Sequence, residues 1–177
     1  MIESRKMLME YLEADRIALQ RQQGWGWLVD DIWRYERVMR KHEYYINTKG
    51  RNIIWWVMRK YYGWRQQKIG IRLGFSISPN CFGPGLVIWH YGSILVHPKA
   101  RIGANAQINA GCVIGKNDKG EAPVIGANLK CQPGAKICGN IVLGDNVRVG
   151  LNAVVTHSFP RGNCVLVGVP ARPLVKE

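Results

Sequence analysis

The chain has 177 residues, of which 47% are hydrophobic and 21% charged, a composition that excludes a disordered chain and can supply a folded core. No run of 18 apolar residues occurs and charges recur throughout residues 1–24, so we expect neither a membrane-spanning helix nor a secretory signal. The net charge of +13 favours an anionic partner.

The first 74 residues are predicted to form a small helical region for oligomerisation or docking. Ser4 can cap a first helix, and apolar residues that recur every three or four positions over residues 28–46, with His42 among them, predict a second amphipathic helix. Residues 52–62 are almost entirely aromatic or aliphatic. They predict a third helix that is buried against the other two or against a second subunit. The alternative is an interfacial helix with Trp and Tyr at the headgroup boundary of a membrane.

Residues 75–177 contain an internal repeat with a period of six. Every sixth residue from 125 to 155 is apolar, and a second apolar or small residue follows four positions after most of these. The first series is Ile125, Cys131, Ile137, Leu143, Val149 and Val155, and an earlier block in another phase is His90, Val96, Ile102, Ile108 and Ile114. Such a period is typical of short strands joined by tight turns, three to a coil of a triangular prism, with the key residue inside. We expect Gly and Asn after the key positions to adopt left-handed backbone at the corners.

The two blocks are separated by a charged stretch that cannot form a face of the prism. Residues 116–123 contain Lys, Asp, Glu, Gly and Pro, and Ile114 and Ile125 are 11 rather than 12 positions apart. We therefore predict a loop that protrudes from the coil, and protruding loops are where sites are built.

With these repeats, residues 76–175 resemble the left-handed β-helix acyltransferases, and the closing motif Val167–Arg172 matches that family. The segment Phe82–Ser93 and the helical N-terminus resemble serine acetyltransferases and their relatives in bacterial surface-polysaccharide synthesis. The resemblance implies an all-β left-handed parallel β-helix after the helices, an acetyl-CoA donor bound in clefts between subunits, and a homotrimer. A dimer of trimers joined through the N-terminal helices is the alternative assembly.

His90 is the candidate catalytic residue. It interrupts the aliphatic series, and we expect the protruding loop to lie near it. An imidazole can take the proton of an attacking alcohol and later give it to the departing thiolate. In serine acetyltransferases an aspartate precedes this histidine, whereas here Trp89 does. The orienting carboxylate is replaced by Ser76, so we expect Ser76 or a backbone carbonyl to orient His90 in its place. An Arg-His pair that holds the amino acid is replaced by Glu121-Ala122.

The resemblance also implies contacts for the donor. Backbone groups at coil corners would meet the pantetheine arm, and cations would meet the phosphates of CoA. The candidate cofactor-binding residues are Gly115, Pro133, Gly134, Leu151, Thr156, His157, Arg172 and Lys176.

The departures from the serine acetyltransferase pattern favour a different acceptor, and we predict a sugar hydroxyl in surface-polysaccharide biosynthesis, free or lipid-linked. Serine O-acetylation for cysteine biosynthesis is the alternative. The candidate acceptor-binding residues are Trp89, Tyr91, Ser93 and His97.

Two other classes receive little support from the sequence. A zinc hydratase of the same fold needs three converging histidines, and a nucleic-acid binder needs a recognition motif. We therefore expect no metal and no nucleic acid. Five cysteines without a C-x-x-C pair favour reduced thiols and a cytoplasmic protein, with peripheral contact at the inner face of the membrane as an extension of that prediction.

Overall fold

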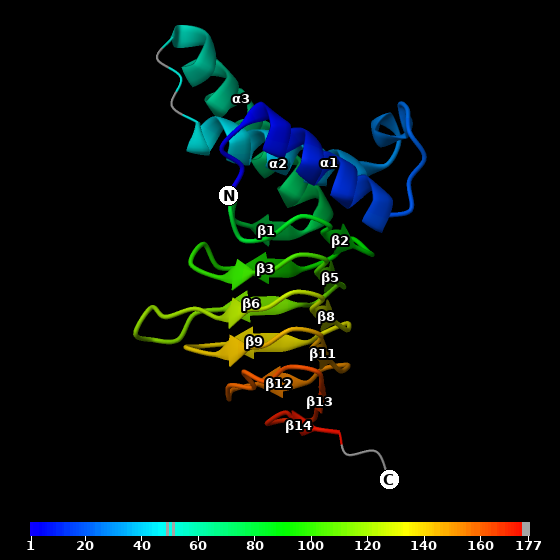
Figure 1. The fold of residues 1–177 in the computed structure, drawn as a ribbon, viewed down its shortest axis with the longest axis vertical. Coiled ribbons are helices and arrows are strands. Elements are labelled where there is room, and N and C mark those ends of the chain that lie inside the picture. The colour runs from blue at the N-terminus through cyan, green and yellow to red at the C-terminus, as the bar shows by residue number, and fades with distance from the viewer. Residues whose placement is uncertain (49, 51, 175–177) are drawn as a thin grey trace.

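Helices at one end of the chain are followed by a tapering solenoid of short strands (Figure 1). The structure is a computed structural model and describes residues 1–48, 50 and 52–174. Within these residues the helices are α1 (Arg5–Ala18), a 3₁₀ turn η1 (Gly26–Leu28), α2 (Asp31–Asn47) and α3 (Ile53–Leu73). None of the described helices is long and apolar enough to cross a membrane.

Each α-helix starts at a polar side chain that accepts a backbone N–H. Ser4 caps α1 as predicted, Asp30 caps α2 and Asn52 caps α3. Because Asp30 caps α2, this helix starts three residues later than Leu28, which lies in η1. The helix α3 continues past the predicted segment 52–62 and ends at Gly74, whose φ of 81° is the left-handed conformation that glycine adopts readily.

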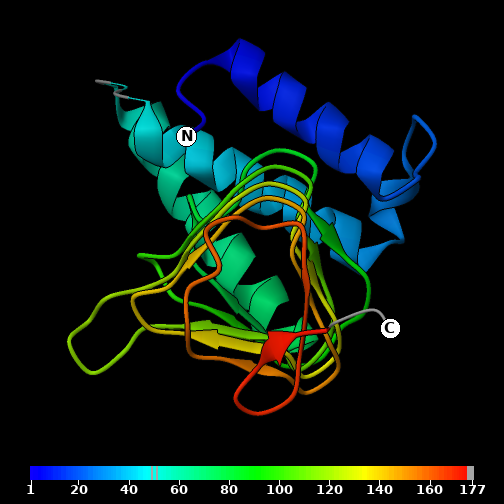
Figure 2. The same ribbon diagram turned by 60° about the horizontal axis from the view of Figure 1, so that its bottom comes forward.

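The strands form the three faces of a prism, which Figure 2 shows nearly end-on. The faces are the sheets β1-β3-β6-β9-β12, β4-β7-β10 and β2-β5-β8-β11-β13-β14, parallel throughout except for the final pair β13 and β14. The strands are β1 (Phe75–Ile77), β2 (Val87–Ile88), β3 (Ile94–Val96), β4 (Arg101–Ile102), β5 (Gln107–Ile108), β6 (Val113–Gly115), β7 (Val124–Ile125), β8 (Lys130–Cys131), β9 (Lys136–Cys138), β10 (Val142–Leu143), β11 (Arg148–Val149), β12 (Val154–Val155), β13 (Val165–Val167) and β14 (Arg172–Pro173).

The predicted period of six describes how these strands stack. Key residues of successive coils pair in register, as Ile114 does with Ile137 and Ile125 with Leu143. The key residues from Val96 onward are buried in one continuous core. The segment 116–123 protrudes from this core between β6 and β7, as predicted, and is visible at the left of Figures 1 and 2.

Gly and Asn after the key positions, for which we predicted the same left-handed backbone, differ in their backbone conformation. Asn128, Asn146 and Asn152 have φ between 52° and 61°, so they adopt the predicted left-handed backbone. Gly126 and Gly144 do not. A Cβ on Gly126 would lie 2.8 Å from the backbone of Gly144, so these glycines allow adjacent coils to approach.

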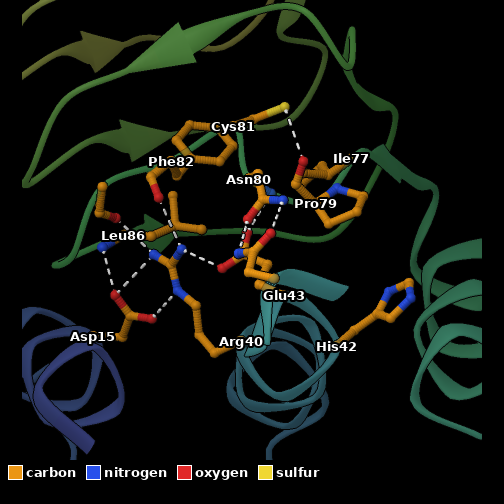
Figure 3. Close-up of polar contacts among 12 residues, drawn as sticks. Asp15, Arg40, His42, Glu43, Ile77, Pro79, Asn80, Cys81, Phe82 and Leu86 are labelled. Atoms are coloured by element: carbon orange, nitrogen blue, oxygen red, sulfur yellow. Dashed lines mark hydrogen bonds and ion pairs between the residues drawn. The ribbon is translucent and has the colours of Figure 1, made fainter. Parts of the chain in front are cut away.

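A buried polar cluster joins the helices to the first coil (Figure 3). The guanidinium of Arg40 is fully buried and contacts the carboxylates of Asp15 and Glu43 at 2.8 and 3.0 Å. It also donates to the carbonyl oxygens of Phe82 and Gly83 at 2.9 and 2.7 Å. Burial alone would lower the pKa of Arg40, but the two carboxylates outweigh it and raise this pKa above its ordinary value.

The same cluster satisfies the backbone at the open edge of the first coil. Asp15 accepts the N–H groups of Gly85 and Leu86, at 2.8 and 2.9 Å. Glu43 and Glu36 likewise accept one backbone N–H each, from the residues at 80 and 88. A solenoid leaves such groups unpaired at its first coil, so the helices act as its cap.

Of the arrangements predicted for residues 52–62, burial against the other two helices is found on one side of the segment only. Trp55 and Tyr62 pack against α2 through Tyr45, with ring centroids 4.8 and 5.4 Å apart. The opposite side of the segment, which includes Ile53 and Trp56, is exposed. The helix rests on its neighbours along one side only.

Candidate active site

One corner of the prism brings together His90 and several residues that we predicted to bind the donor. This corner, here called the His90 corner, joins the sheet β2-β5-β8-β11-β13-β14 to the sheet β1-β3-β6-β9-β12 in each coil. A ladder of backbone hydrogen bonds runs along it: Gly111 donates to Ser93 at 2.7 Å, Gly134 to Ala110 at 2.9 Å and Asn152 to Pro133 at 3.0 Å. The order along the ladder is 89–93, 109–111, 132–134 and 150–152.

His90 lies on an exposed turn at the first step of this ladder. Two backbone hydrogen bonds hold the turn against the end of α3, from Gly92 to Leu73 at 2.8 Å and from Ile94 to Gly74 at 3.0 Å. The helices therefore determine where the imidazole is presented.

Our prediction that His90 occupies a key position of the repeat is wrong. Ile88 occupies that position, because it is buried and pairs in register with Ile108. The next key residue, Val96, follows after eight residues rather than six, so the extra residues bulge outward. His90 is thus outside the prism, on a surface where it can meet a substrate.

The predicted acceptor-binding residues divide between two corners. Trp89, Tyr91 and Ser93 are exposed on the same turn as His90. His97 follows the C-terminal end of β3, at the corner of the prism on the other side of the β1-β3-β6-β9-β12 sheet. Its Nδ1 accepts the N–H of Lys99 at 3.3 Å. No side-chain hydrogen bond joins Ser76 to His90 in the part of the chain that the structure describes, so the predicted orienting contact is not formed there.

The predicted donor-binding residues divide in the same way. Pro133, Gly134 and Leu151 lie on the His90 corner, and Leu151 is 68% exposed. Gly115, Thr156 and His157 lie with His97 on a second corner, here called the loop corner, where Thr156 Oγ1 is 3.0 Å from His157 Nδ1.

Arg172 is exposed on β14, which pairs with β13 at the last coil. Lys176 lies outside the described residues.

The protruding loop belongs to the loop corner of the third coil, so within one chain it is not beside His90 as we had expected. It is held at its base by Glu121, whose N–H and carboxylate bond with the Asn117 side chain at 2.9 Å. Lys99 donates to the Gly120 carbonyl oxygen at 3.0 Å.

One cation at the His90 corner was missed by the sequence analysis. Lys136 leaves β9 on the outer face and its Nζ donates to the Gly134 carbonyl oxygen at 2.9 Å. The alternation of outward and inward residues on this strand could have indicated it. The described residues contain no group of three or more His, Cys, Asp or Glu side chains placed to hold a metal ion.

These features define the class of fold as a left-handed parallel β-helix with an N-terminal helical cap, and solved serine acetyltransferases have the same fold. The enzyme from Neisseria gonorrhoeae superposes with a TM-score of 0.74 and 24% identity, over 98% of this chain and 68% of that one. A serine acetyltransferase in complex with CoA gives 0.77 and 22%, over 96% and 71%.

Sequence comparison leads to the same proteins. A serine acetyltransferase from Helicobacter pylori is 33% identical over 108 residues, which are 59% of this chain and 63% of the relative. For those from Staphylococcus xylosus and Synechococcus elongatus the identities are 36% and 32% over 108 residues, 59% of this chain in each case, and 49% and 44% of the relatives. The chain thus spans about half the length of the curated relatives it matches. No protein-family model matches the chain.

These comparisons overturn our main prediction of the acceptor. The matched relatives and the structural neighbours are serine acetyltransferases by name. The prediction of a sugar hydroxyl in surface-polysaccharide biosynthesis, free or lipid-linked, is therefore wrong, and the alternative, serine O-acetylation, is better supported.

Proposed function

We propose that this protein is an acetyl-CoA-dependent serine O-acetyltransferase and that His90 is its general base. The observation that carries the proposal is the similarity of 108 residues to serine acetyltransferases from three genera. His90, exposed on the turn that begins the His90 corner, is the side chain that could act as the base in this reaction.

In the proposed reaction, His90 accepts the proton of the serine hydroxyl as its oxygen attacks the thioester carbonyl carbon. The oxygen–carbon bond forms first, and the carbon–sulfur bond then breaks to release the thiolate of CoA. His90 returns the proton to that thiolate, so the products are O-acetylserine and CoA. A positioned base of this kind contributes about 10²–10⁴ in rate.

The His90 corner has the features that the donor requires. Its stacked turns expose backbone groups to an extended amide-containing arm, and Leu151 offers an exposed apolar side chain. The side chains of Lys136 and Arg172 supply cations for the phosphates of CoA. We propose that these residues, with Pro133 and Gly134, bind acetyl-CoA.

We further propose that the active unit is a homotrimer. In one chain, the residues assigned to the site lie on two corners, which are at opposite ends of the strands of the β1-β3-β6-β9-β12 sheet. Three prisms around a three-fold axis would place the loop corner of one chain beside the His90 corner of the next. His97, Gly115, Thr156 and His157 would then contribute to the same cleft as His90.

The acceptor side departs from the serine acetyltransferase pattern, so turnover of serine must be compared with turnover of other hydroxyl acceptors. Trp89 and Ser76 stand where the pattern has carboxylates, and Ser76 makes no hydrogen bond with His90 among the described residues. We propose that Tyr91, Ser93 and Trp89, exposed around His90, complete the acceptor site.

The test is release of CoA from acetyl-CoA in the presence of L-serine, with O-acetylserine identified by mass spectrometry. Threonine and homoserine serve as competing hydroxyl acceptors. We expect serine turnover, and His90→Ala to lower kcat by about 10²–10⁴. His42→Gln is the matched control, because His42 lies in α2 and bonds with Gln66. Absence of serine turnover by a folded sample would overturn the proposed acceptor, and near-normal kcat in His90→Ala would overturn the assignment of the base.

A further inference from the structure

A face of α3 that is turned away from the rest of the molecule carries exposed apolar side chains from its first turn to its last. Ile53, Val57, Trp64 and Ile71 follow one another at spacings of four, seven and seven, which places them on one line of an α-helix. Each is between 43 and 75% exposed. Exposed side chains on either side of the line widen it, and these are Ile54, Trp56 and Tyr61. We call this set the α3 face.

The charges that accompany the α3 face are all positive. The sequence of α3 contains no acidic residue. Lys60 and Lys68 are exposed and lie in the line itself, each stacked on a tryptophan of the face. The Lys60 Nζ is 5.8 Å from the centre of the Trp56 ring, and the Lys68 Nζ is 5.5 Å from that of Trp64. Each ammonium can thus stay at a polar boundary while its alkyl stem lies on an apolar ring.

The face is also free of the prism. Figure 1 shows the first half of α3 extending past α2 at the end of the molecule opposite the C-terminus. The other side of α3 is the one that packs, with Gln66, Ile69 and Leu73 buried. The face is therefore not needed to close the core of this chain.

We propose that the α3 face binds the surface of an anionic phospholipid bilayer, with Trp and Ile at the level of the headgroups and the lysines on lipid phosphates. Aromatic and aliphatic residues mixed with Lys and Arg on one helix are typical of interfacial helices. Charge favours this occupant over a second copy of the same face, since two such faces would bring lysines against lysines without a carboxylate from either α3. The binding is peripheral, and it is independent of the proposed acetyl transfer.

The test is co-sedimentation of the full chain with vesicles of phosphatidylglycerol and phosphatidylcholine, compared with vesicles of phosphatidylcholine alone. Each cation near an anionic surface raises partitioning about fivefold. Lys60→Gln combined with Lys68→Gln should therefore lower binding to the anionic vesicles about 25-fold. Trp56→Ala with Trp64→Ala should lower binding to a similar or greater extent.

A matched control separates this face from general exposure of aromatic residues. Trp25 is 75% exposed but precedes η1 and is not part of α3, so Trp25→Ala should bind as the wild type does. Far-ultraviolet circular dichroism confirms that each variant is folded.

Three outcomes would overturn the proposal. The first is absence of binding to the anionic vesicles at low salt. The second is equal binding to both kinds of vesicle. The third concerns the alternative occupant and is read by light scattering in solution. If Trp56→Ala with Trp64→Ala splits a larger assembly into smaller ones without changing vesicle binding, the face is an interface between copies of this chain.

Discussion

Replacing Arg40 by methionine tests whether the buried polar cluster holds the helices on the first coil. The variant keeps an unbranched side chain of similar length but leaves the carboxylates of Asp15 and Glu43 buried without their cation. It also removes the donor from the carbonyl oxygens of Phe82 and Gly83. Removing one partner of a buried ion pair costs about 3–5 kcal/mol. Asp15 and Glu43 retain their backbone donors, so we expect about 4 kcal/mol, within that range.

The assay is urea unfolding followed by circular dichroism at one protein concentration, because assembly makes apparent stability depend on concentration. With a slope of about 2 kcal/mol per molar urea, the midpoint of Arg40→Met should fall by about 2 M. Arg72→Met is the matched control. Arg72 pairs with Asp31 at 2.6 Å but is 57% exposed, and exposed pairs contribute about 0–1 kcal/mol. Equal shifts in the two variants would refute the assignment of the cluster as the cap.

Two further predictions concern the same end of the prism. Burial, reinforced by the charge of Asp15, raises the pKa of Glu36 well above its ordinary value near 4.5. The folded state therefore holds a proton that the unfolded state has lost, and stability declines as pH rises from about 4.5 through the folded pKa. Glu36→Gln removes that decline, so its thermal midpoint should rise relative to the wild type between pH 5 and pH 8, and parallel curves would contradict the reasoning. In Gly74→Ala, the new methyl group would lie 2.8 Å from the Gly92 carbonyl oxygen, so displacement of the His90 turn should lower kcat about 10–100-fold. Gly24→Ala, at φ +125° with nothing within 4 Å, should leave kcat unchanged, and equal kcat values in the two variants would show that Gly74 does not position the turn.

Much of the prism could be predicted from the sequence because its rule is local. A key residue such as Ile137 must be apolar wherever the coil repeats, so the period of six is present in the sequence itself. The protruding loop could be predicted for the same reason, since seven of the eight residues 116–123 are charged or turn-forming and such a segment cannot form a face of the prism. The corner glycines were misread because the contact that requires them, such as Gly126 against Gly144, is made with a residue one coil away.

The register of the first coil could not be read in this way. The repeat is extended by two residues between Ile88 and Val96, and a count of six from Val96 falls on His90. Only the burial of Ile88 and its pairing with Ile108 distinguish a histidine inside the prism from one on a bulged turn. The prediction of the acceptor was wrong because it depended on a few substituted positions. Single positions such as Trp89 differ from serine acetyltransferases, but the similarity to those enzymes extends over 108 residues.

The cap was also invisible in the sequence, where Arg40 looks like one of many cations on the polar side of a helix. Its partners Asp15 and Phe82 are 25 and 42 positions away, and no local pattern links them. Yet the first coil has a neighbouring coil on one side only, and on the other side its backbone is satisfied by helix side chains. The same helical region fixes the His90 turn through the carbonyl oxygens of Leu73 and Gly74. Closing the open end of the solenoid and presenting the proposed base are therefore one structural task. It follows that substitutions in the cap should alter kcat even where the fold survives.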